Sequence, residues 1–431
     1  MKAELSQHYR DRQPSDIRKA QLLFLERPDR DAIRVVNLAI GNVSLPMHPA
    51  MRERLSRLAA DPSPFASGVV RYTPTAGTEE AQRAFKNVIA SSGLATDGLH
   101  CVVTDGGSQA MELMVLGVCG PGSARPLLLL DPAYSNYRDI AARAGVDTVC
   151  VERRLDGGGC FAAPDLGEVE RIVESRRPAA VVVIPSDNPT GQFMAPATLT
   201  ELAALCVRYG MWLVSDEAYR ELHYAGGDAT SVWRLSEDEV PGVTGRRISI
   251  ESSSKVWNAC GLRVGAFVTD DQEMAVQATA EYTANLCSNA IGQWIFGALA
   301  DVPPAELRSW FERQRSYYEP LMRTVTEELL KEMPGVVVSS PEAALYSVVD
   351  VGGIAPDGFR ARDFVSFCAE RGKVAMGGAD HTLLVAPMGG FYGDPASGET
   401  RMRIAYVEPP EEMEKVPRLF AQLFASYVEQ L

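Results

Sequence analysis

Short apolar runs alternate with amphipathic stretches through the middle of the chain. The runs are HCVVTD (100–105), PLLLLD (126–131), AAVVVIPSD (179–187), MWLVSDE (211–217), RISIESSS (247–254) and GAFVTD (265–270). Between two of them, LTELAALCVRYG (199–210) repeats apolar residues every three or four positions and ends at a glycine, which predicts a helix. Continuous Val, Ile and Leu runs joined by helices are typical of a mostly parallel sheet covered on both faces. The pattern therefore predicts an α/β fold.

The pattern of apolar and polar residues is different at the two ends of the chain. Residues 1–45 are a polar arm with a helical pattern around 16–26. After about residue 300 come long charged helical stretches, with strand patterns at GVVVSS (335–340) and TRMRIAYV (400–407). We therefore predict an N-terminal arm over 1–45 that contributes to a smaller domain, a large domain over 46–300, and a smaller α+β domain over 301–431.

Composition and charge narrow the class of protein. A chain of 431 residues is long enough for two domains, and its 46% hydrophobic and 23% charged content is near the globular average. The net charge of −14 argues against nucleic-acid binding, which needs clustered Lys and Arg. We see neither an apolar run of membrane-spanning length nor a secretory leader, so we expect no membrane association and a cytoplasmic location. The eight cysteines and five histidines show no CxxC or HExxH spacing, and we expect no metal site.

One polar stretch could form a phosphate-binding site. In TDGGSQAME (104–112), paired glycines follow an apolar run and open a helical pattern. The backbone N–H groups of Gly107, Ser108 and Gln109 would then lie at a helix N-terminus, which favours anions. Taken alone, Gly-Gly-Ser before a helix is more often a turn and a cap.

Four other apolar runs are followed by residues that could bind a ligand or take part in catalysis. They supply Tyr134 in DPAY, Asn188 in SDNPTG, Asp216 and Tyr219 in SDEAY, and Lys255 with Arg263 in SSSKVWNACGLRVG. Each alone has an ordinary reading as a turn, a cap or a loop residue. Because ligands in open α/β sheets bind at the carboxyl ends of the strands, five such ends together predict one site.

These stretches resemble a known family, the class I/II aminotransferases of the aspartate aminotransferase superfamily, which are fold-type I pyridoxal-phosphate enzymes. The matching segments run in the family's order from about residue 35 to 406: NLAIG, RYTPTAGTEEAQRAF, GGSQA, DPAY, SDNPTG, SDEAY, SSSKVWNACGLRVG and RMRIAY. The resemblance implies a large, mostly parallel α/β/α domain, a smaller α+β domain, pyridoxal 5'-phosphate as cofactor, and a homodimer with shared active sites.

The resemblance also implies a role for each matching residue. Lys255 forms the internal aldimine and shuttles a proton, Asp216 pairs with the protonated ring nitrogen, and Tyr219 hydrogen-bonds the ring oxygen. The further cofactor contacts are Asn188 at the ring oxygen, Tyr134 stacked on the ring, Gly107, Ser108, Gln109, Ser252, Ser254 and Arg263 at the phosphate, and Tyr72 at the phosphate of the neighbouring subunit. Arg403 binds the substrate α-carboxylate, helped by Asn188 and the backbone near Gly41.

The substrate is less well determined by the resemblance. Enzymes of this kind that prefer dicarboxylates place an extra cation where this chain has Ala284 or Ser108. An aspartate donor is therefore not expected, and Arg18 in the N-terminal arm is the candidate cation for acidic ligands such as 2-oxoglutarate.

Two functions remain open at this point. The favoured one is transamination between an L-amino acid and a 2-oxo acid, 2-oxoglutarate being the expected acceptor. The alternative is a β-lyase of the same fold, such as a C–S lyase, because the cofactor residues serve the first steps of both reactions. A regulator that keeps this fold as a sensor is disfavoured, since only about 35 residues precede the fold and the chain is acidic.

Overall fold

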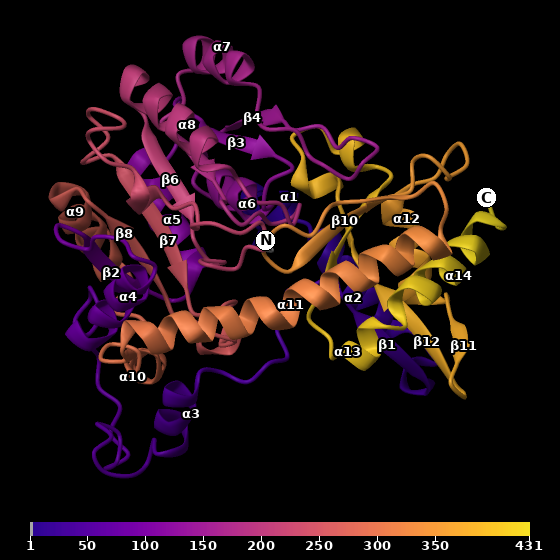
Figure 1. The fold of residues 1–431 in the computed structure, drawn as a ribbon, viewed down its shortest axis with the longest axis horizontal. Helices are drawn as coiled ribbons and strands as arrows, with labels where there is room; N and C mark the ends of the chain where they lie inside the picture. The colour runs from indigo at the N-terminus through magenta and orange to yellow at the C-terminus, as the bar shows by residue number, and fades with distance from the viewer. Residues whose placement is uncertain (1–2) are drawn as a thin grey trace. The chain divides into compact units, whose positions relative to one another are not determined.

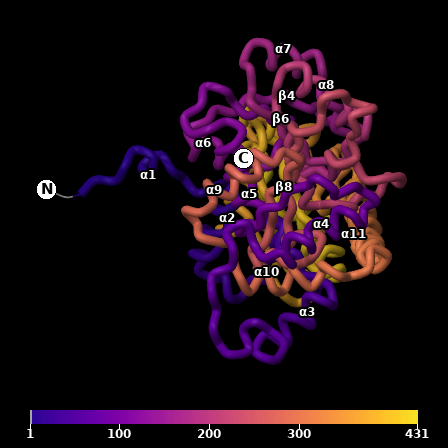
Figure 2. Tube along the Cα trace, turned by 90° about the vertical axis from the view of Figure 1, so that its left-hand side faces the viewer, coloured from indigo at the N-terminus to yellow at the C-terminus, as the bar shows by residue number. Residues whose placement is uncertain are grey.

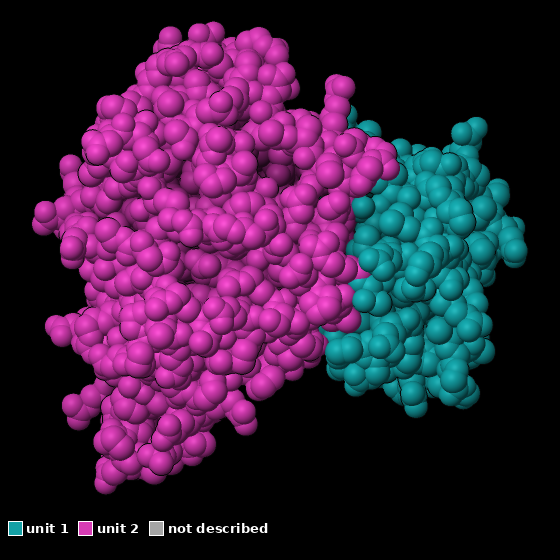
Figure 3. Space-filling view, viewed as in Figure 1, with its two compact units in different colours: residues 1–41, 324–338, 348–431 teal, residues 42–323, 339–347 magenta. Residues whose placement is uncertain are grey.

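The computed structural model describes residues 3–431 as two compact units. Of the described residues, unit 1 comprises 3–41, 324–338 and 348–431, and unit 2 comprises 42–323 and 339–347 (Figure 3). The helix α11 (Pro304–Glu332) contributes to both units, and so does the strand β10 (Tyr346–Asp350). Residues 301–323 and 339–347, which the sequence pattern assigned to the smaller domain, thus belong to unit 2.

A seven-stranded sheet forms the centre of unit 2, in the order β2-β8-β7-β6-β5-β3-β4. Its strands are β2 (His100–Thr104), β3 (Leu127–Asp131), β4 (Thr148–Glu152), β5 (Ala180–Val183), β6 (Trp212–Asp216), β7 (Arg247–Ser252) and β8 (Gly265–Thr269). The pairs from β4 to β7 are parallel, whereas β8 runs antiparallel to both β2 and β7. The mostly parallel sheet predicted from the apolar runs is confirmed.

Helices cover this sheet and explain why its strands are so apolar. The helices that lie wholly in unit 2 are α3 (Pro49–Ser56), α4 (Glu79–Ser91), α5 (Gly107–Val118), α6 (Asn136–Arg143), α7 (Leu166–Arg176), α8 (Pro196–Tyr209), α9 (Gln272–Tyr282) and α10 (Ala290–Gly297). Of these, α3 packs against α10, away from the sheet (Figure 1). In Figure 1, α5 packs against β7 and β8, α8 against β6, and α7 against β4. Every residue of β3 is buried, and each leucine there contributes roughly 1.5–3 kcal/mol by leaving water.

Unit 1 contains two small sheets with helices. One sheet has the order β1-β12-β11 and the other has the order β13-β14-β10-β9. Their strands, besides β10, are β1 (Ile33–Asn37), β9 (Val337–Val338), β11 (Val374–Met376), β12 (Ala379–Leu384), β13 (Ala386–Pro387) and β14 (Arg401–Ala405). The helices are α1 (Gln7–Asp11), α2 (Asp16–Glu26), α12 (Ala361–Glu370), α13 (Pro410–Met413) and α14 (Val416–Val428).

The N-terminal arm begins with the short helix α1. The side chains of residues 3–11 are all exposed, and Figure 2 shows this segment extending away from α2. The helical pattern seen around 16–26 corresponds to α2, which begins after the N-cap Ser15. Within residues 3–431, none of the helices combines the length and the apolar character needed to cross a membrane.

Candidate active site

The carboxyl ends of the sheet strands in unit 2 bring the predicted residues to one edge. β3, β5, β6 and β7 are parallel, so the loops that follow them leave from the same side of the sheet. β2 shares their direction, because Thr104 and Ser252 both pair with Gly265 of the antiparallel β8. The loop before α5 and the loop that carries Lys255 are therefore neighbours.

The paired-glycine turn forms a cradle with open backbone donors. α5 begins at Gly107, and its N-cap Gly106 supplies no side-chain cap, which leaves N–H groups of the first turn available. Gly106 has φ +77°, and a Cβ there would overlap the guanidinium of Arg263. Arg263 also lies 3.5 Å from the Ser254 hydroxyl, and the Ser252 hydroxyl accepts from the Ser254 N–H at 3.1 Å. A helix N-terminus, two hydroxyls and a guanidinium together suit a phosphate.

The loop that carries Lys255 is held at several points. Lys255 is half-buried, and the carbonyl of the next residue, Val256, accepts a 2.8 Å hydrogen bond from the indole of Trp310. On the other side, the Ser253 N–H donates to the Val264 carbonyl at 3.0 Å. The backbone on both sides of the lysine is thus fixed by hydrogen bonds within unit 2.

Asp216 is a buried carboxylate at the end of β6, only 4% exposed. Its Oδ2 accepts a 2.9 Å hydrogen bond from the Tyr137 hydroxyl, and its Oδ1 accepts from the Ala218 N–H at 3.2 Å. Burial raises the pKa of Asp216 to about 6, and the charges of Glu217 and Glu251 add to this. A cation beside the carboxylate would remove this penalty.

Asn188 and Tyr219 lie together, as predicted for two residues at one ring oxygen. The Asn188 side-chain amide is 3.4 Å from the Tyr219 hydroxyl, and both residues are buried. The Tyr219 hydroxyl is also 2.9 Å from the hydroxyl of Tyr346, a residue that the sequence analysis missed. Tyr346 lies 127 positions further along the chain, so no local pattern links the two.

Tyr134 and Tyr137 form one aromatic pair beside Asp216. Their rings meet edge to face, with centroids 6.4 Å apart and an interplanar angle of 84°. Tyr137 was also missed; its place three positions after Tyr134, in the first turn of α6, is the only local signal for it. The pair joins the half-buried Tyr134 to the carboxylate through Tyr137.

A buried arginine connects two of the loops. The guanidinium of Arg153 lies 2.8 Å from the Asp187 carboxylate and donates a 2.8 Å hydrogen bond to the Pro132 carbonyl. Asp187 precedes Asn188, and Pro132 lies two positions before Tyr134. Arg153 therefore connects the loops that carry Asn188 and Tyr134. No motif in the sequence points to this role.

Three of the predicted substrate residues, Gly41, Arg403 and Arg18, belong to unit 1. Arg403 is buried in β14, and its Nη2 donates a 2.6 Å hydrogen bond to the carbonyl of Ala39, two positions before the buried Gly41. Its guanidinium lies 5.2 Å from the ring centre of Phe391. Arg18 is exposed on α2 and donates to the Gln21 side chain at 2.7 Å.

Other predicted positions are at the surface of unit 2. Tyr72 is 79% exposed, in the loop before α4. Ser108 and Ala284 are exposed, the latter in a short 3-10 turn after α9. The Gln109 side chain donates to Glu112 at 3.1 Å, and its backbone N–H, in the first turn of α5, donates to the Gly106 carbonyl at 3.2 Å.

The residues at the edge of this sheet fit the parts of pyridoxal phosphate. The cradle of Gly106, Arg263 and the serine hydroxyls matches the phosphate. The buried Asp216, which accepts from two neutral donors and has a raised pKa, matches a protonated ring nitrogen. Lys255 is the amine on the adjoining loop.

The chain matches the model of one protein family over most of its length. Residues 33–416 match the family described as aminotransferase class I and II. The match covers both the sheet of unit 2 and β14 of unit 1.

Curated relatives with this similarity are named aminotransferases. The chain is 26% identical over 396 residues to the aspartate/prephenate aminotransferase of Thermus thermophilus, covering 91% of this chain and 92% of the relative. It is 28% identical over 285 residues to the arginine–pyruvate transaminase of Pseudomonas aeruginosa, covering 66% and 67%. The transamination reading is thereby supported, with the substrate left open.

Solved structures with a similar fold are also aminotransferases. The aspartate aminotransferase of Thermus thermophilus with maleate superimposes with a TM-score of 0.79 at 25% identity, covering 98% of this chain and 100% of that one. The predicted family, fold class and cofactor are confirmed. The chain belongs to the class I and II aminotransferase family and is a fold-type I, pyridoxal-phosphate-dependent aminotransferase.

Proposed function

We propose that Lys255 carries the cofactor and that this enzyme transfers the amino group of a neutral L-amino acid to a 2-oxo acid. The observation that carries the proposal is the meeting of three groups at one sheet edge: an anion cradle, a buried carboxylate and a half-buried lysine. Each fits a different part of the cofactor.

Pyridoxal phosphate, when bound, withdraws electrons from the substrate Cα. Asp216 would keep the ring nitrogen protonated, because a buried carboxylate with a pKa raised to about 6 gains most from a cationic neighbour. Tyr137 and the Ala218 N–H orient that carboxylate through its two oxygens. Each oxygen keeps a second lone pair, with which the carboxylate can accept a hydrogen bond from the ring nitrogen.

Lys255 would move the proton at the substrate Cα. The hydrogen bonds to the Val256 and Val264 carbonyls restrict the loop on either side of it. A fixed backbone under a flexible side chain lets the amine reach more than one position while it stays in the site. Asn188 and Tyr219 would bind the ring oxygen, with Tyr134 against the ring face.

The substrate carboxylate would be bound by Arg403, helped by Asn188 and the backbone near Gly41. A planar guanidinium can donate two parallel hydrogen bonds to a carboxylate, which an ammonium group cannot do. The absence of a cation at Ala284 and Ser108 supports a neutral donor. For 2-oxoglutarate as acceptor, Arg18 is the candidate partner of the distal carboxylate.

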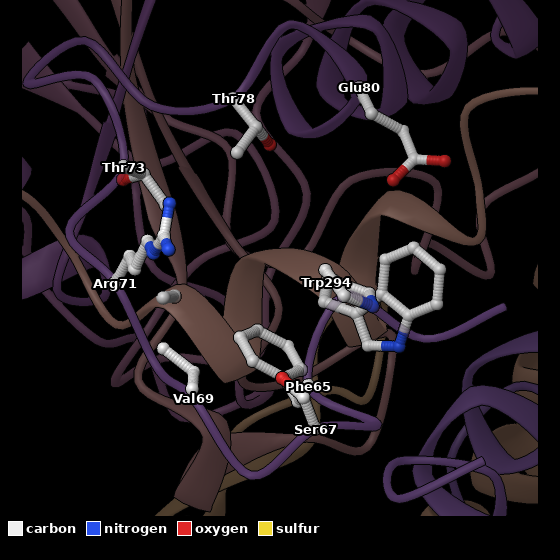
Figure 4. A pocket seen from close by; sticks show the side chains of 10 residues that line it. Phe65, Ser67, Val69, Arg71, Thr73, Thr78, Glu80 and Trp294 are labelled. Carbon is white, nitrogen blue, oxygen red and sulfur yellow. The ribbon is translucent and has the colours of Figure 1, made fainter. Parts of the chain in front are cut away.

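We further propose a cytoplasmic homodimer in which Tyr72 completes the neighbour's site. Val69, Val70 and Tyr72 are 49%, 58% and 79% exposed on one loop, an unusual grouping for a free surface. Beside it lies a cavity of about 380 Å³, whose lining includes Phe65, Arg71 and Trp294 (Figure 4). The cytoplasmic location is supported by the lack of disulfides among the described residues.

An amino-donor screen tests the proposed reaction. The holoenzyme is incubated with 2-oxoglutarate and single L-amino acids, and both donor loss and glutamate formation are measured. Equal loss of a neutral donor and gain of glutamate is the expected result. Donor loss that continues without any 2-oxo acid would contradict the proposal.

A further inference from the structure

The hydroxyl groups of Tyr219 and Tyr346 share a buried hydrogen bond. Their oxygens are 2.9 Å apart, and the rings meet edge to face at 5.7 Å and 82°. Tyr346 is 1% exposed and Tyr219 is 4% exposed, so water does not compete for this bond. A buried hydroxyl pair of this kind is costly to break, because each partner would lose its hydrogen bond.

Tyr346 is anchored to the loop that carries Asn188. The Ala343 and Glu342 N–H groups both donate to the Gly191 carbonyl, at 2.7 and 3.0 Å. Gly191 has φ +71°, and a Cβ there would overlap the Tyr346 carbonyl oxygen. The close packing fixes Tyr346 against the SDNPTG turn.

The same segment is also tied to the helix-like turn after β6. The Ala344 N–H donates to the Leu222 carbonyl at 2.8 Å, three positions after Tyr219. Tyr346 is thereby held against both of the loops that we place at the ring oxygen. These backbone bonds fix the main chain of Tyr346 relative to the turn that carries Tyr219.

The hydrogen-bond partners of the Tyr219 hydroxyl limit where its proton can be donated. A phenol has one donor and two acceptor positions. The Asn188 amide can only donate to the Tyr219 oxygen, at 3.4 Å. If Tyr346 donates to the other lone pair, the single proton of Tyr219 is left for a third partner.

We propose that Tyr346 is a positioning residue for transamination: it donates its hydroxyl proton to Tyr219, so that Tyr219 directs its own proton to the ring oxygen of the cofactor. This inference rests on the role proposed for Tyr219. A donor that also accepts a hydrogen bond is a stronger donor, so Tyr346 acts through Tyr219 without contacting the substrate.

The Tyr219 phenol keeps its proton in the pH range of the enzyme. The ionisable groups that face Tyr219 are Tyr346, Asp216 and Tyr134. Burial and these neighbours raise the pKa of Tyr219 well above its ordinary value. The Tyr219 hydroxyl therefore remains a hydrogen-bond donor at any pH at which the bound cofactor is titrated.

The test measures the pH midpoint of the visible absorbance of the bound cofactor, without substrate. Donation from Tyr219 to the ring oxygen lowers the proton affinity of the lysine–cofactor linkage, so Tyr346→Phe should raise the midpoint by roughly 0.5–1 pH unit. Tyr427→Phe, a change in a buried tyrosine of α14 that faces Asp363 and Arg371, is the matched control and should leave it unchanged. A midpoint in Tyr346→Phe equal to that of the control overturns the inference.

Two additions keep the test decisive. Tyr219→Phe should raise the midpoint further, and adding Tyr346→Phe to it should have no additional effect. If Tyr219→Phe does not shift the midpoint, the proposed role of Tyr219 fails; if it does and Tyr346→Phe does not, only the present inference fails. If Tyr346→Phe folds poorly, 3-fluorotyrosine is placed at position 346 instead, because it has nearly the same shape and is a stronger hydrogen-bond donor. This replacement should lower the midpoint, and an unchanged midpoint would overturn the inference.

Discussion

The hydroxyl of Tyr137 donates a 2.9 Å hydrogen bond to the Asp216 carboxylate, and both side chains are buried. Even with this donor and the Ala218 N–H, burial keeps the pKa of Asp216 raised, to about 6. The carboxylate is therefore destabilising by itself and becomes favourable beside a cation. This relationship leads to two predictions, one for the protein without cofactor and one for the holoenzyme.

Without cofactor, Asp216→Asn should make the protein more stable at pH 8. The folded pKa of about 6 lies above the unfolded value, so the native state binds more protons and stability falls as pH rises between the two values. Above pH 6 the full penalty, about 3 kcal/mol, is present, and at pH 4.5 it is about 1 kcal/mol. Unfolding by denaturant at both pH values measures the gain. The exposed Asp238→Asn is the control, and a gain that is equal at pH 4.5 and 8 would show a packing effect instead.

In the holoenzyme, Asp216→Asn should reduce kcat/KM by roughly 100- to 1,000-fold. The neutral amide no longer holds the ring nitrogen protonated, and the loss is on the order of that for one oxyanion-hole donor, about 2.7–4 kcal/mol. Steady-state kinetics at saturating cofactor measures it. Activity within about tenfold of the wild type would mean that Asp216 only caps the turn after β6.

Substrate preference should favour neutral donors over aspartate. With Ala284 and Ser108 in place of cations, a second carboxylate would be buried at a cost of several kcal/mol. The measurement is kcat/KM for aspartate, phenylalanine and alanine in the wild type and in Arg18→Ala. If kcat/KM for aspartate exceeds the values for the other two donors by more than about tenfold, the inference that Ala284 and Ser108 leave the pocket without a cation is wrong. If Arg18→Ala leaves all three ratios unchanged, Arg18 has no part in selecting the side chain.

Subunit mixing should reveal a shared site. Tyr72→Ala and Lys255→Ala should each be nearly inactive as homodimers, because the first alters the neighbour's phosphate site and the second removes the proton carrier. Refolding the two together forms heterodimers with one intact site, so activity should return to roughly a quarter of the wild type at equal mixing. No recovery in a mixture that sedimentation shows to be dimeric would contradict a shared site.

Much of the fold could be predicted because local patterns determine it. The six apolar runs became β2, β3 and β5 to β8, whereas β4 was not predicted, and the amphipathic stretch at 199–210 became most of α8. The strands expected near 335–340 and 400–407 are present as β9 and β14, the first with only two residues. Arg18, expected on an arm, lies on α2, where the Ser15 cap starts a regular helix.

The site residues that were missed act through contacts distant in sequence. Tyr137 matters because α6 turns its hydroxyl toward the end of β6, 79 positions away. Tyr346 is the first residue of β10, and Arg153 follows β4 to reach the Asp187 carboxylate. Each is an ordinary buried residue in the sequence, and only the packing gives it a partner in the site.

The position of the covalent link tests the central claim most directly. The holoenzyme is reduced with borohydride, digested, and searched by mass spectrometry for the cofactor adduct. The account predicts a single adduct on Lys255, its loss in Lys255→Ala with less than a trace of turnover, and its retention in Lys331→Ala, a change of an exposed lysine on α11. An adduct on another lysine, or none in a protein that is isolated with its cofactor, would contradict the account.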